Sequence, residues 1–96
     1  NNTEKILKGV RLKTRGNGET YHIFIRTSET RSYRDFYYAT FVAKENWQIV
    51  DLPFIRFKHR FSNKLLNGND IRTFGIVAYG RDFISDVSVS DIIFYN

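Results

Sequence analysis

Few residues of this 96-residue chain have the types and spacings that catalysis requires. The two histidines, His22 and His59, have no second histidine and no carboxylate at the spacing of a metal site, and a catalytic histidine also needs an orienting partner. Cysteine is absent, which excludes thiol nucleophiles, thiolate metal ligands and disulfides. Gly16-Asn17-Gly18 is typical of a turn, because neither a GxGxxG motif nor a predicted helix follows it. We therefore expect a protein that is not an enzyme and holds no metal or organic cofactor.

The residues best suited to binding are cationic and aromatic. The formal net charge is +5 and is unevenly distributed. Residues 1–64 hold thirteen Lys and Arg against six Asp and Glu, whereas residues 65–96 hold two against four. A basic surface attracts anionic partners, although a solvated surface without a partner has the same composition. The candidate binding surface comprises Arg11, Lys13, His22, Phe24, Arg26, Tyr38, Arg56, Lys58 and Arg60.

Alternation with a period of two residues identifies the elements that position these side chains. Residues 10–15 alternate between inward-type residues and cations, which predicts a strand with one wet, cationic face. The Asn17-Gly18 pair that follows suits a tight hairpin turn. The return strand then has Tyr21, Ile23 and Ile25 on one face, so that His22, Phe24 and Arg26 fall on the other.

Further strands are predicted where aromatic and β-branched residues concentrate, at 36–43, 46–52, 71–79 and 86–95. Pro53 should end the fourth strand because proline cannot donate to a ladder. Residues 54–69 lack clean alternation and are expected to form a long excursion with at most one short helical turn. About six strands in one domain, residues 1–96, indicate an all-β antiparallel sandwich or jelly roll.

The densest aromatic segment is 47–57. We expect Trp47 to be largely buried and to pack between the two sheets with Val50 and Leu52. Pro53 would then turn the chain outward, and Phe54 and Phe57 would close the end of the sandwich.

These segments resemble the complex I intermediate-associated protein 30 family, a branch of the galactose-binding-like jelly rolls. The resemblance is carried by residues 9–18 (GVRLKTRGNG), 21–27, 37–41, 47–57, 71–76 and 87–93. It implies a non-catalytic module that assists assembly of respiratory complex I in mitochondrial members. The related carbohydrate-binding modules share the 47–57 pattern. The chain departs from the family in lacking its earlier strands and in having Phe61 where a glycine usually follows the loop arginine.

Three kinds of partner follow from this interpretation. A protein partner is the first expectation, and a carbohydrate bound on a platform of Tyr38, Phe24 and His22 is the alternative. Aromatic side chains between cations also suit base stacking, but no RNA-recognition signature and no oligonucleotide-binding barrel pattern is visible, so nucleic acid is not favoured.

The predicted jelly roll is incomplete, because about six strands stand where about eight are typical. We expect residues ahead of Asn1, since the chain holds no methionine. A second copy of the chain, or a second polypeptide, would supply the missing strands along residues 10–14 or 87–95. No run is apolar and long enough for a membrane span. The absence of cysteine favours an intracellular location, cytoplasmic or, in a eukaryote, mitochondrial.

Overall fold

Alternating residues form two antiparallel sheets that pack face to face, so the prediction of an all-β sandwich is confirmed. The computed structural model describes residues 6–32, 34–78 and 86–96, and no α-helix occurs among them. Two single-turn 3-10 helices, η1 (Phe54–Arg56) and η2 (Gly68–Asp70), lie in and after the predicted excursion. The strands are β1 (Gly9–Gly16), β2 (Thr20–Thr27), β3 (Tyr37–Val42), β4 (Gln48–Pro53), β5 (Lys58–His59), β6 (Ile71–Val77) and β7 (Val87–Tyr95).

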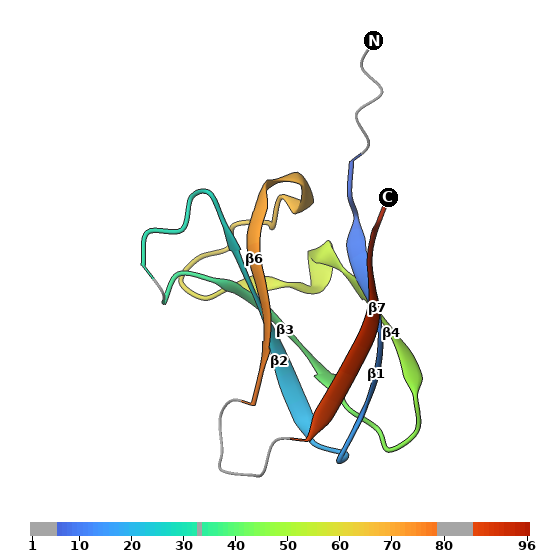
Figure 1. Ribbon diagram of the computed structural model, residues 1–96. Coiled ribbons are helices and arrows are strands. Elements are labelled where there is room, and N and C mark those ends of the chain that lie inside the picture. The colour runs from blue at the N-terminus through green and yellow to red at the C-terminus, as the bar shows by residue number, and fades with distance from the viewer. Residues whose placement is uncertain (1–5, 33, 79–85) are drawn as a thin grey trace.

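One sheet has three strands in the order β4-β1-β7, and the other has four in the order β5-β3-β2-β6. Figure 1 shows the four-stranded sheet on the left and the three-stranded sheet on the right. Along the chain, β1 lies in the three-stranded sheet, β2 and β3 lie in the four-stranded sheet, and β4 returns to the first. The two-residue strand β5 was not predicted. The predicted end of the 71–79 strand falls partly outside the described residues.

The turn at Asn17-Gly18 is present, but the predicted hairpin is wrong. Gly18 has a φ of 82°, which glycine adopts without a steric penalty. However, β1 pairs with β4 and β7, whereas β2 pairs with β3 and β6. The backbone N–H groups of Gly16 and Gly18 donate to the carbonyl oxygens of Lys44 and Ala43, both at 2.7 Å. These bonds direct the chain across the core into the opposite sheet.

The inner faces of the two sheets form one core, as the alternation predicted. The largest fully buried side chains are those of Tyr21, Leu12, Ile23, Ile25, Val10 and Thr14. Phe54 and Phe57 are buried beside each other with ring centroids 6.0 Å apart, and Phe54 also contacts the ring of Phe94. The expectation that these two phenylalanines are buried beneath the β4 end is therefore confirmed.

The prediction that Trp47 is buried is wrong. Its side chain is 44% exposed and precedes β4, which begins at Gln48. The register pairs Lys13 with Ile49, so odd-numbered residues of this region face outward with the cations of β1. The Trp47 ring accordingly lies under Lys13 and Arg15, at 5.9 and 5.7 Å from its centroid. Leu52 is buried and Val50 is half-buried, as expected.

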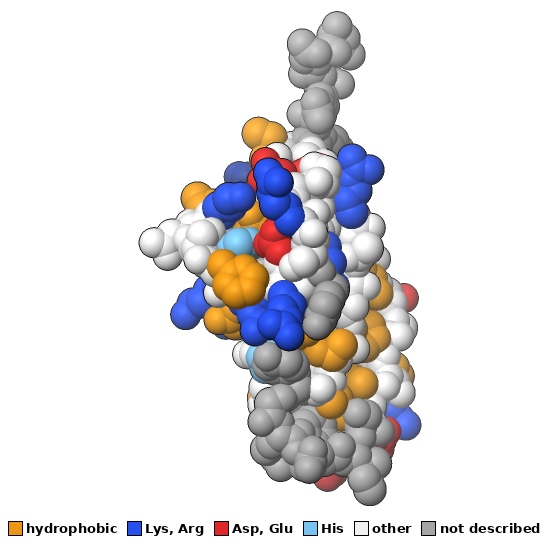
Figure 2. Space-filling view, turned by 90° about the vertical axis from the view of Figure 1, so that its left-hand side faces the viewer, with side chains coloured by type: hydrophobic (Ala, Val, Ile, Leu, Met, Phe, Trp, Pro, Cys, Tyr) orange, Lys and Arg blue, Asp and Glu red, His pale blue; other side chains and the backbone are white. Residues whose placement is uncertain are grey.

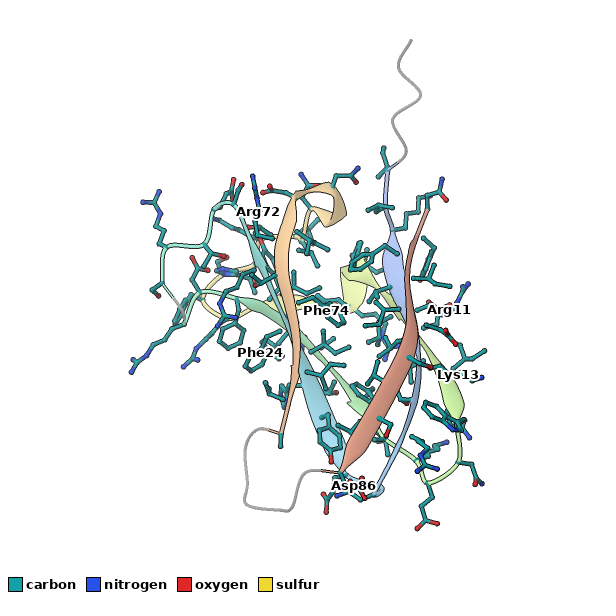
Figure 3. The ribbon with its side chains drawn as sticks, in the orientation of Figure 1. Arg11, Lys13, Phe24, Arg72, Phe74 and Asp86 are labelled. Atoms are coloured by element: carbon teal, nitrogen blue, oxygen red, sulfur yellow. The ribbon has the colours of Figure 1, made fainter. Side chains whose placement is uncertain are left out.

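The first strand is not an open edge, contrary to expectation, because β1 lies between β4 and β7. The last strand, β7, is an edge, and so is β6 of the other sheet. Both edge strands lie toward the viewer in Figure 1, each in front of the other strands of its sheet. Their inward residues Phe74, Ile76, Val87 and Val89 are only partly buried against the core. Phe74 points between the sheets (Figure 3), and its ring lies 6.1 Å from that of Phe94.

Substitution of a buried and of an exposed residue by alanine should have different effects on stability. Leu12→Ala should lower the free energy of unfolding by about 2–5 kcal/mol, because it leaves a cavity where a fully buried side chain stood. Trp47→Ala should cost only about 1 kcal/mol, chiefly through lost cation–π contacts. Urea unfolding of both variants measures the difference. Equal losses would show that Trp47 supports the core after all.

We also expect the purified chain to associate through the β6–β7 side, because unpaired edges beside apolar residues template contacts with other chains. Light scattering at micromolar concentration should detect the larger species. Val89→Lys, which places a charge on this side, should reduce association, while Ile49→Lys on β4 should not. A monomer at all concentrations would show that β6 and β7 close the fold unaided.

Candidate functional site

The outer face of the four-stranded sheet collects aromatic and cationic side chains. Because Tyr21, Ile23 and Ile25 point inward, the alternating residues of β2 point outward. The register places Phe24 beside Tyr38 of β3, and Tyr38 beside Lys58 of β5. We call this surface the aromatic–cationic face and define it as His22, Phe24, Arg26, Phe36, Tyr38, Lys58 and Arg60.

The rings of this face pack against one another. Phe24 and Phe36 stack with their centroids 4.1 Å apart. His22 meets Phe24 edge-on at 5.9 Å and lies 6.0 Å from Tyr38. Such contacts hold each ring in a defined position. The rings and Arg60 line a hollow of about 270 Å³.

On the β6 side, the neighbour of Phe24 is a glycine. Gly75 of β6 lies opposite Phe24, on the same face of the sheet. A Cβ atom added at Gly75 would meet no atom within 4 Å. A side chain at position 75 would therefore have open space beside the sheet. Figure 3 shows Phe24 and Phe74 on opposite faces of the sheet.

Two guanidinium groups lie over the buried ring of Phe36. Arg26 lies 5.6 Å from the ring centroid and Arg60 lies 5.3 Å from it. The backbone N–H of Arg60 donates to the carbonyl oxygen of Phe36 at 3.0 Å. This bond holds the Arg60 backbone, from which its side chain extends, next to Phe36. No residue of the defined face is acidic. Figure 2 shows Lys and Arg side chains around hydrophobic ones on this side of the molecule.

Burial lowers the pKa of His22, because the charged imidazolium loses its hydration. The neutral form is therefore favoured at neutral pH. The positive charge of the face comes from Arg26, Lys58 and Arg60 rather than from the histidine.

The structure brings together most of the residues that the sequence nominated. His22, Phe24, Arg26, Tyr38, Lys58 and Arg60 share the aromatic–cationic face. Arg56 lines an adjoining hollow of about 180 Å³ with Tyr38 and Lys58. Arg11 and Lys13 instead belong to the other sheet, whose outer face points the opposite way (Figure 3).

Arg11 is moreover engaged by its neighbours. Its guanidinium lies 3.1 Å from a carboxylate oxygen of Asp51 and 4.8 Å from the ring centroid of Tyr95. The Tyr95 hydroxyl donates to Asp51, and this bond, followed by that from Arg11, lowers the pKa of Asp51. The same hydrogen bond raises the pKa of Tyr95.

Phe36 is the functional residue that sequence reasoning missed. It was predicted only as the start of a strand, yet the guanidinium groups of Arg26 and Arg60 both pack on its ring. The alternation of Phe36, Tyr38 and Thr40 could have revealed it. Tyr38 and Thr40 face outward from β3, and a period of two puts Phe36 on the same face.

His59 is not the ordinary surface histidine that its sequence context indicated. Its side chain is only 8% exposed, and its Nε2 lies 2.6 Å from Oδ1 of Asp35. Its Nδ1 lies 2.8 Å from the hydroxyl oxygen of Ser62. With the proton on Nε2, the neutral ring donates to Asp35 and accepts from Ser62.

This series has the order of a nucleophile, a base and an orienting acid. The Ser62 hydroxyl, however, also accepts the backbone N–H of Lys64 at 3.1 Å, and Asp35 accepts that of Arg31 at 3.2 Å. Both bonds close local turns. The arrangement therefore ties the loop before β3 to the segment after β5.

Among the described residues, no group of three or more His, Cys, Asp or Glu could hold a metal ion. In the same part of the chain, no helix is long and apolar enough to cross a membrane.

The fold and the face together define a β-sandwich domain whose four-stranded sheet carries ordered aromatic and cationic side chains on its outer face. Comparison with known families gives the more specific assignment. The family model described as Complex I intermediate-associated protein 30 (CIA30) matches residues 4–86 of the 96. The chain belongs to this family, which confirms the resemblance inferred from its motifs. Searches of curated proteins and of solved structures found no match.

The Asp35–His59 contact predicts a pH-dependent stability. The hydrogen bond from His59, and then the backbone bond from Arg31, lower the pKa of Asp35 below its ordinary value of 3.8. A carboxylate with a lowered folded-state pKa stabilises the fold above its unfolded pKa and loses that contribution as the pH falls through the folded value. Asp35→Asn should therefore be less stable than wild type at neutral pH.

The difference between the two proteins should shrink as the pH falls through 3.8 and below. Urea unfolding over this pH range measures it, with Glu45→Gln as a control for loss of one negative charge. A difference that stays constant down to the lowest pH would mean that the Asp35 carboxylate is not held by this contact.

Proposed function

We propose that this chain is a non-catalytic protein-binding module that acts in the assembly of complex I. The name of its family refers to an association with complex I intermediates. The aromatic–cationic face is the observation that supports the binding role, because its rings and cations are held in place and line a hollow of about 270 Å³.

The chemistry of this face suits an acidic segment of a protein partner. Arginine and aromatic side chains supply most of the binding energy at protein interfaces. Here Arg26 and Arg60 are already ordered by Phe36, so binding would cost less side-chain entropy. The absence of acidic residues from the face would favour encounter with carboxylate-bearing surfaces.

A carbohydrate fits this face less well. Sugar recognition requires exposed ring faces together with side chains that accept hydrogen bonds. Phe24 and Phe36 cover one face of each other, and the described residues that line the hollow include no Asp, Glu, Asn or Gln. The same mutual stacking leaves the rings less available to nucleic-acid bases.

Charge reversal at two matched sites tests the proposal. Arg26→Glu with Arg60→Glu removes the cations over Phe36, whereas Lys13→Glu with Arg15→Glu removes the cations over Trp47 on the opposite sheet. Each pair changes the net charge equally. In cells lacking the endogenous gene, only the first pair should lower the amount of assembled complex I on native gels, while both proteins melt alike.

Loss of assembly in both pairs, or in neither, would contradict the assignment of this face. A glycan array provides the second measurement. Binding of a neutral glycan that Phe24→Ala abolishes would favour the carbohydrate alternative instead.

A further inference from the structure

The 54–66 segment, which runs from η1 through β5 toward η2, exposes three large apolar side chains. Ile55 is 84% exposed, Phe61 63% and Leu65 78%. Other apolar residues of the same segment, Phe54, Phe57 and Leu66, are buried. The segment is thus anchored in the core by one set of apolar residues and displays another set to solvent.

Cations separate the exposed apolar residues. The segment contains Arg56, Lys58, Arg60 and Lys64 but no Asp or Glu. Among the neighbouring carboxylates, Asp35 is engaged by His59, and Glu29 lies 3.6 Å from the ammonium group of Lys64. The surface of this segment is therefore both apolar and strongly cationic.

The exposed side chains stand on an ordered scaffold. Phe57 N–H donates to the carbonyl oxygen of Phe54, and β5 pairs with β3 through His59 and Tyr37. The His59 ring then holds the turn that contains Ser62. Ile55 and Leu65 line one hollow of about 390 Å³ together with Lys58 and Lys64. Insertion of the exposed side chains of Ile55, Phe61 and Leu65 into an apolar phase would therefore require little further ordering of the backbone.

We propose that the 54–66 segment binds the surface of an anionic lipid bilayer. Ile55, Phe61 and Leu65 enter the boundary between headgroups and acyl chains, and the cations contact lipid phosphates. Charge complementarity favours this occupant. A protein hot spot needs a patch that becomes fully desolvated, whereas the cations between these apolar side chains can stay hydrated beside anionic headgroups while the apolar side chains insert.

This inference does not rest on the proposed protein-binding role. The three apolar tips lie outside the aromatic–cationic face, although Lys58 and Arg60 belong to both surfaces. Arg26 lies outside the segment. An Arg26→Glu variant can therefore lose assembly activity while it still binds vesicles, so that failure of either proposal is recognisable.

Sedimentation with vesicles of phosphatidylcholine, alone or mixed with phosphatidylglycerol, tests the inference. The purified chain should bind the mixed vesicles, more weakly as the salt concentration rises, and should not bind phosphatidylcholine alone. The triple variant Ile55→Ser, Phe61→Ser, Leu65→Ser should bind about tenfold more weakly or worse. The matched control Ile49→Ser with Ile93→Ser removes two exposed side chains, 69% and 53% exposed, from the three-stranded sheet and should bind normally.

A fluorescence measurement reports insertion directly and does not depend on the stability of the triple variant. Trp47 is the single tryptophan, and its exposure makes Trp47→Phe a suitable background. In that background, emission from Phe61→Trp should shift to shorter wavelength on addition of the mixed vesicles, whereas emission from Ile49→Trp should not.

The proposal is wrong if the chain fails to bind the mixed vesicles, or if the control pair weakens binding as much as the triple variant. It is also wrong if both tryptophans shift equally. Binding to polyglutamate without binding to vesicles would identify the segment as a docking surface for an acidic protein instead.

Discussion

The passage of the chain from β1 across the core into β2 is the constraint on which the molecule depends. Bonds from Gly16 and Gly18 to the residues that follow β3 hold this crossing in place. The inner faces of β1 and β2 must then face each other, and every outward residue of these strands is assigned to one of two opposed surfaces. The separation of the cationic residues into two groups follows from this single crossing.

The outer faces of the two sheets both carry cation–π contacts. On each, a pair of cations lies over an aromatic ring, Phe36 on the four-stranded sheet and Trp47 on the other. They differ in what surrounds the pair. The four-stranded sheet adds stacked rings and a hollow beside Gly75, whereas the three-stranded sheet commits its next cation, Arg11, to Asp51. The first arrangement includes a recess lined by aromatic side chains and Arg60.

Sequence reasoning predicted what depends on local pattern and failed where distant residues decide. The faces of β2 were predicted correctly, because a period of two assigns each side chain to one surface. The pattern cannot say which strand lies beside which, so Asn17-Gly18 was interpreted as a hairpin. Trp47 was misplaced because it was grouped with Leu52, although a period of two puts these residues on opposite faces, and β4 begins at Gln48, two residues after the predicted start. The Asp35–His59 contact joins residues 24 positions apart and left no motif to find.

The pairing of β1 with β7 also bears on how the molecule is made. Gly9 lies opposite Tyr95, so the first strand cannot complete its sheet until residues 87–95 have left the ribosome. Until then the apolar face of β1 lacks its β7 neighbour, and closing so long a loop is slow. Even a domain this small should therefore spend part of its synthesis as a client of the chaperones that shield nascent chains.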